Sequence, residues 1–120
     1  MAPWLDARIP VLVGADLRPG DAALVEQGAA APPGVPQAAF AVESRPEDGH
    51  LAGCACCAAR TGAAVALDRL FLRRARGEVA FFGRVTAVLA TAAGEASLRA
   101  ALDSDPVVSA RYRLDPAQPA

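Results

Sequence analysis

The strongest constraint on the fold of this chain is a helical repeat of apolar residues between Ala58 and Arg76. Apolar side chains recur there at spacings of three and four, which places them along one face of an α-helix. Gly77 follows directly and supplies a stop signal. We therefore expect a helix over 58–76 whose apolar stripe packs against a sheet; the stripe consists of Ala63, Ala66, Leu67, Leu70 and Phe71.

Short apolar runs on both sides of this helix have the length and composition of buried strands. They cover residues 9–14, 38–42 and 84–90, and the last of them is rich in β-branched residues. Between the first two runs, residues 31–36 contain three prolines, which exclude regular structure there. The sequence therefore predicts three strands.

Further helices are predicted between and after these strands. Residues 19–27, followed by a glycine, have the pattern of a short helix, and residues 95–102 form another. Pro106 suits the first position of a last helical turn that continues to Arg111. The resulting order β-α-β-α-β-α predicts the α/β class, as a small three-layer domain with a short, mostly parallel sheet.

The length and charge of the chain limit what it can do. A chain of 120 residues is the size of one domain, so we treat residues 1–120 as a single unit with a disordered tail at 116–120. Apolar residues make up 53%, but many are alanines, so the core is expected to be modest. The net charge of -1 argues against a general affinity for nucleic acid or anionic membranes.

The chain has no stretch that approaches the roughly 20 apolar residues of a transmembrane helix. Near the N-terminus, the apolar run 9–15 is interrupted by Pro10 and followed by Asp16, which makes a poor signal peptide. We therefore predict a cytoplasmic protein.

All three cysteines lie within four positions, as Cys54, Cys56 and Cys57. An odd number argues against structural disulfides and favours a metal site or reactive thiols. Three thiolates on one short loop suit Zn²⁺, Cu(I) or another thiophilic ion. His50 is a candidate fourth ligand; an acid in the segment 43–48, water or a partner are alternatives. The positive end of the helix that follows would also favour the thiolate form.

The cysteine segment also resembles a known family. Gly53-Cys-Ala-Cys-Cys57 is similar to the Gly-Cys-x-Cys-Cys segment of CobW-type (CobW/HypB/UreG-like) metallochaperone GTPases, and the similarity extends through residues 72–78, 82–85 and 102–115, more weakly 9–24. The resemblance implies part of a P-loop GTPase fold. It also implies that the three cysteines bind the transported metal.

The GTP-binding residues of that family are not matched. A phosphate-binding loop needs G-x-x-x-x-G-K-[ST], but Gly20 stands where lysine belongs and Asp21 where Ser or Thr belongs. The chain has no lysine elsewhere, and Val88 falls where the family's second switch has an acid. We therefore expect neither nucleotide binding nor GTP hydrolysis, and we expect the family's C-terminal domain to be absent.

Three functions remain in competition. The first is a non-catalytic metal-binding or metal-handling protein that uses Cys54, Cys56, Cys57 and His50. The second is an interaction module that regulates a full-length GTPase relative, or self-associates through exposed sheet edges. The third is thiol redox chemistry at the same cysteines. In a fourth interpretation the cysteines are only small buried residues.

Overall fold

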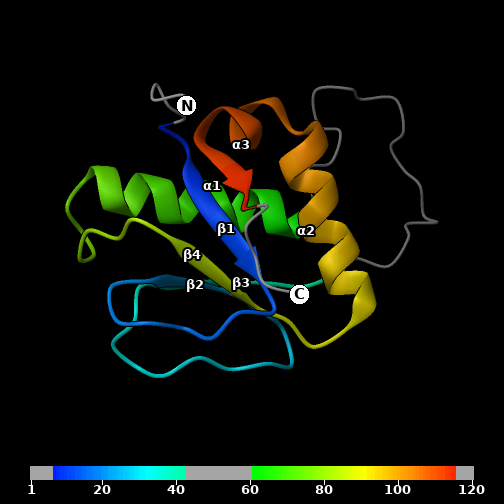
Figure 1. The fold of residues 1–120 in the computed structure, drawn as a ribbon, viewed down its shortest axis with the longest axis horizontal. Helices are drawn as coiled ribbons and strands as arrows, with labels where there is room; N and C mark the ends of the chain where they lie inside the picture. The colour runs from blue at the N-terminus through cyan, green and yellow to red at the C-terminus, as the bar shows by residue number, and fades with distance from the viewer. Residues whose placement is uncertain (1–6, 43–60, 116–120) are drawn as a thin grey trace.

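The computed structural model describes residues 7–42 and 61–115 (Figure 1). Its elements are β1 (Ile9–Val13), β2 (Ala22–Glu26), β3 (Gln37–Phe40), α1 (Gly62–Ala75), β4 (Val85–Val88), α2 (Ala92–Ser104), α3 (Pro106–Arg111) and β5 (Tyr112–Leu114). The five strands form one sheet in the order β3-β2-β4-β1-β5, and every pairing in it is parallel. The predicted α/β class and parallel sheet are confirmed.

Most of the predicted elements are present with shifted ends. β1, β3 and β4 occupy the three predicted strand regions, and α3 matches the helical turn after residue 105. α2 is longer than the predicted 95–102 because it begins at Ala92, after the capping residue Thr91. α1 begins at Gly62, and residues 58–60 of the predicted helix lie outside the described residues, as does the predicted tail 116–120.

The prediction of a helix over 19–27 is wrong, because these residues form β2. All five residues of β2 are buried, and it pairs with β3 on one side and β4 on the other. A strand with neighbours on both sides and both faces covered has a continuous apolar run rather than an alternating one. The glycine at position 28, which looked like a helix stop, has φ 103° and turns the chain after the strand.

β5 was not predicted at all. This short strand follows α3 directly and pairs with the outer side of β1, so it forms one edge of the sheet. Its first residue, Tyr112, is completely buried, and the hydroxyl donates a hydrogen bond of 2.8 Å to the carbonyl oxygen of Leu67 in α1. Burial raises the pKa of the Tyr112 phenol, so this hydrogen bond is retained throughout the ordinary pH range.

The three helices pack on one face of the sheet and share a single core with it. The predicted stripe of α1 faces this core, since Ala63, Ala66, Leu67 and Leu70 are at most 1% exposed. Phe71, the fifth stripe residue, is only partly buried and meets the ring of Tyr112 edge to face, with the ring centroids 6.3 Å apart. α1 lies behind the strands in Figure 1, while α2 runs beside β5.

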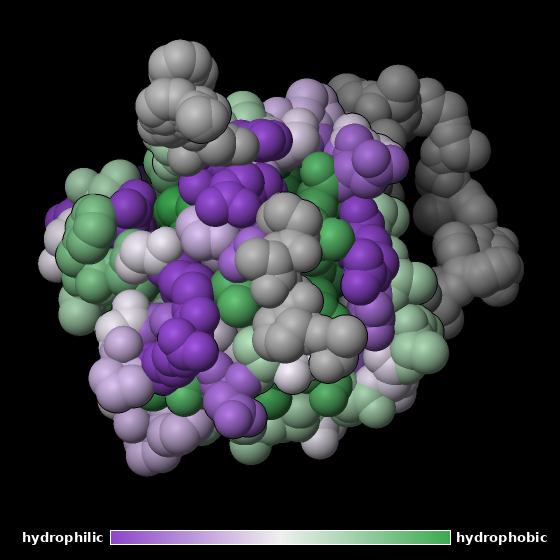
Figure 2. Space-filling view, in the orientation of Figure 1, coloured by the Kyte–Doolittle hydropathy of each residue, from purple (hydrophilic) through white to green (hydrophobic). Residues whose placement is uncertain are grey.

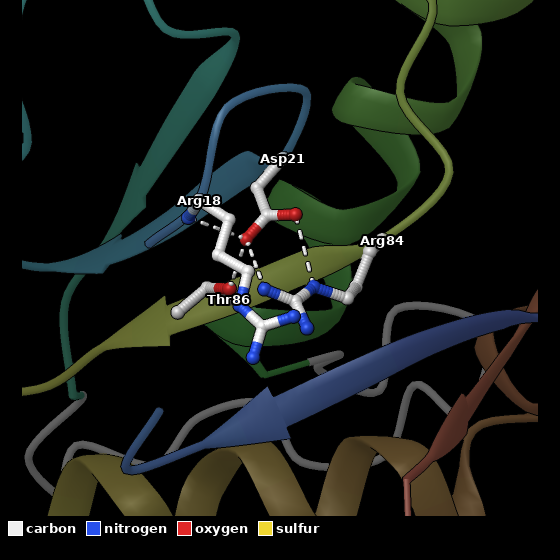
Figure 3. Close-up of polar contacts among 4 residues, drawn as sticks. All are labelled: Arg18, Asp21, Arg84 and Thr86. Atoms are coloured by element: carbon white, nitrogen blue, oxygen red, sulfur yellow. Dashed lines mark hydrogen bonds and ion pairs between the residues drawn. The ribbon is translucent and has the colours of Figure 1, made fainter. Parts of the chain in front are cut away.

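The opposite face of the sheet is covered in part by the connection from β1 to β2, residues 14–21, which crosses back without a helix (Figure 1). Asp21, at the end of this connection, has a side chain only 5% exposed. Its carboxylate accepts hydrogen bonds from Arg84 Nε and Nη2 at 2.9 and 2.8 Å, from Thr86 Oγ1 at 2.8 Å and from the Arg18 amide at 2.9 Å (Figure 3). Burial would raise the pKa of Asp21, but these hydrogen bonds outweigh it and lower the pKa.

No helix in residues 7–42 and 61–115 is long and apolar enough to cross a membrane.

Candidate functional site

The carboxyl ends of the parallel strands form the edge at which open α/β sheets bind their ligands. At this edge the chain leaves β3 and returns at the start of α1. The two points lie against each other, since a Cβ built on Gly62 would be 2.8 Å from the carbonyl oxygen of Ala41. The segment that contains all three cysteines therefore starts and ends at the same place on this edge.

The four predicted metal ligands, Cys54, Cys56, Cys57 and His50, lie outside the described residues. The residues on either side of the segment that contains them, Val42 and Thr61, are described. Val42 and Thr61 line the same open hollow of about 330 Å³ between the start of α1 and the first turns of α2; the other lining residues are Gly62, Ala93, Ala96 and Ser97. The predicted ligands thus belong to a segment anchored beside this hollow.

The N-terminus of α1 gives this region a positive electrostatic character. Thr61 caps the helix, with its hydroxyl accepting a 3.1 Å hydrogen bond from the Ala64 amide, and the first turn contains no acidic residue. The dipole of the helix therefore favours anionic groups nearby. Cys57 is four positions before Thr61 in the sequence, which limits their separation to about 14 Å for an extended chain.

At the same edge of the sheet, the N-terminus of α2 binds a carboxylate from the protein itself. Glu26, the last residue of β2, is 3% exposed and lies at the N-terminus of α2. Its Oε1 accepts hydrogen bonds from the amides of Ala90 and Thr91 at 2.7 and 2.9 Å, and its Oε2 accepts one from Thr91 Oγ1 at 2.7 Å. The hydrogen bond from the Thr91 hydroxyl, followed by those from the backbone, lowers the pKa of Glu26.

The fit around this carboxylate is close. A Cβ built on Gly94 would overlap the Glu26 carboxyl group, so only glycine at position 94 leaves room for it. The amides that follow β4 therefore hold an internal carboxylate.

Acid is expected to destabilise the protein through Glu26. Because the folded-state pKa lies below the usual value of 4.5, the carboxylate stabilises the fold above that pH, and this contribution is lost as the pH falls through the folded-state pKa. Glu26→Gln should lower the melting temperature at pH 7 and reduce its decline as the pH falls below about 4.5. Thermal melts across this range test the expectation. An unchanged acid slope in the variant would mean that Glu26 does not carry this effect.

Within residues 7–42 and 61–115, no three His, Cys, Asp or Glu side chains gather in a way that could hold a metal ion. The described part of the chain contains neither cysteine nor histidine. A thiolate site in this protein therefore requires the segment 43–60.

Comparison with known proteins gives no further identification. The chain matches no protein-family model, no curated protein and no solved structure. The resemblance to CobW-type GTPases therefore rests on the sequence motifs alone.

The contact between Glu26 and the start of α2 was not predicted. The sequence pattern predicts a helix at Glu26, whereas Glu26 ends a strand. A threonine before a helical pattern is a capping signal, and Thr91 could have been identified from it. The acid that completes the cap comes from 65 positions earlier, and such a distant pairing leaves no local pattern.

Proposed function

We propose that this chain is a non-catalytic metal-binding protein that holds Zn²⁺ or another thiophilic ion through Cys54, Cys56 and Cys57. The observation that supports this most is the contact between Ala41 and Gly62, which gives the cysteine segment two adjacent attachment points. A segment whose ends are held together has already lost part of its chain entropy. Bringing its thiols together around one ion therefore costs less additional chain entropy.

The chemistry of the donor set also fits a soft ion. Thiolates are the preferred protein ligands of Zn²⁺, with Zn–S distances of about 2.3 Å. The capped N-terminus of α1 and the absence of acids from its first turn favour thiolates over thiols close to it. His50 would be a fourth ligand. A reducing compartment would keep the thiols available, so the proposal places the protein in the cytoplasm.

The proposal also implies that the chain does not bind GTP. The path of the chain after β1 supports this. A phosphate-binding loop places its backbone amides at the N-terminus of a helix that directly follows the strand. Here residues 14–21 lead from β1 into β2 instead, and the part of the chain from residue 7 to residue 42 contains no helix. Asp21, which stands where the magnesium ligand belongs, is paired with Arg84.

A zinc titration of the full-length, untagged chain tests the proposal. Competition with a chromophoric chelator should give one ion per chain, and affinity should weaken as the pH falls below 7, because binding releases thiol protons. Each of Cys54→Ser, Cys56→Ser and Cys57→Ser should weaken binding by about 100-fold or more, or about 2.7 kcal/mol. His50→Ala should have a smaller effect.

Ser97→Ala provides a matched control, because Ser97 lines the neighbouring hollow without supplying a thiol. Serine variants that bind zinc as tightly as the parent would overturn the proposal.

Thiol redox chemistry would instead appear as reversible loss of two free thiols on mild oxidation, with no zinc bound by the reduced chain. A regulatory module would retain a GTPase relative in the presence of chelator, with no zinc bound.

A further inference from the structure

A second open hollow, of about 530 Å³, lies between α2 and the edge strand β5. Three arginines from three elements line it: Arg8 precedes β1, Arg99 belongs to α2 and Arg113 to β5. Asp103 is the one acidic residue among its described lining residues; Ala100, Leu102 and Leu114 supply apolar surface. At the right of Figure 2, where Figure 1 places α2, hydrophilic side chains lie beside apolar ones.

Contacts within the protein orient these arginines. Arg8 Nη1 donates to the carbonyl oxygen of Ser109 at 3.1 Å, and Arg99 Nε donates to Glu95 Oε2 at 2.9 Å. Arg113 Nη1 lies 3.9 Å from the carboxylate of Asp115. Arg8 and Arg113 make further interactions, so the argument rests on the convergence of the three side chains and not on unpaired charge.

Arg99 is the arginine best placed to meet a ligand. Its side chain is 50% exposed, and its partner Glu95 is not among the residues that line the hollow. A guanidinium group has five N–H donors, so the bond to Glu95 leaves others for an incoming acceptor. Carboxylate and phosphate oxygens are the acceptors that this planar group binds best, often through two parallel hydrogen bonds.

The size and the apolar surface of the hollow indicate what a ligand would contain besides an anionic group. Small-molecule sites occupy about 300–1,000 Å³ and combine apolar walls with a few charged groups. Leu102 is 9% exposed and Leu114 is partly buried, so both belong to the packed structure and offer a firm apolar surface. We propose that this hollow binds a small organic anion, with its carboxylate or phosphate group on Arg99 and Arg113 and its apolar part against Leu102 and Leu114.

NMR titration of the full-length ¹⁵N-labelled chain tests this proposal. Benzoate and phenylphosphate are the probes, and benzyl alcohol is the neutral analogue. Saturable shifts are expected for the amides of residues 99–103 and 113–114 with at least one anion, and much weaker ones with benzyl alcohol. The two anions distinguish the two headgroups, and saturable binding of either supports the proposal.

Arg99→Gln should weaken binding of the anion about tenfold or more, since it removes a charge-assisted hydrogen bond. The variant is expected to fold, because the pair that it breaks is half exposed. Arg76→Gln is the matched control: its side chain is 64% exposed after the end of α1 and does not line the hollow. Shifts that do not saturate, equal binding of benzyl alcohol, or equal losses in the two variants would refute the site. None of these outcomes depends on the cysteines.

Discussion

Replacing Leu70 by alanine is expected to lower the free energy of unfolding by about 3 kcal/mol, within the range measured for truncation of buried leucines. Leu70 is completely buried in the core that α1 shares with the sheet. Removing its isobutyl group takes apolar contacts away and leaves a cavity that the neighbouring helices and strands fill only in part. Urea denaturation of parent and variant measures the difference.

Leu72→Ala is a matched control for this prediction. Leu72 is in the same helix, two positions along, but is 41% exposed. The two substitutions change helix propensity equally, so the difference between their effects reports burial. A Leu70→Ala variant that unfolds at the same urea concentration as Leu72→Ala would show that α1 does not pack on the sheet with this face.

Replacing Arg84 by alanine is expected to cost about 3 kcal/mol, because it leaves the Asp21 carboxylate buried without a cation. The pair is bidentate, and Asp21 has little access to water that could replace the guanidinium group. Thr86 Oγ1 and the Arg18 amide remain as donors, which limits the loss. Urea denaturation at pH 7 measures it.

Two further variants give this prediction its controls. Asp21→Ala combined with Arg84→Ala should cost less than the sum of the single changes, because the second change removes the charge that the first leaves unpaired. Arg99→Ala breaks an exposed pair and should cost at most about 0.5 kcal/mol. Equal costs for Arg84→Ala and Arg99→Ala would contradict a stabilising role for the buried pair.

The sequence predicted the parts of the fold that have a clear period or an unambiguous boundary. The stripe of α1 repeats at helical spacing, and four of its five residues are fully buried. β2 was missed because a short, continuously apolar run without alternation suits either a helix or a buried strand. β5 was missed because three residues after a helix are too few for any period, and only the pairing with β1 makes them a strand.

The candidate functional residues also differ in whether the sequence reveals them. The cysteine cluster is visible in the sequence because its members are neighbours, and its role as a metal site stays a prediction. The pair formed by Asp21 and Arg84 spans 63 positions, and nothing near either residue indicates the other. The sequence alone indicates only that Asp21 stands at the position of a magnesium ligand, whereas in the structure it anchors the connection between β1 and β2.

The contact between Ala41 and Gly62 has a consequence for how this protein can change over evolutionary time. Because β3 and α1 are already brought together at that point, the described core does not depend on how much chain is inserted between them. The entropy cost of a longer insertion grows only logarithmically with its length. Residues 43–60 can therefore lengthen or shorten while the sheet and helices keep their packing, so that the proposed metal site and the stability of the scaffold are open to separate selection.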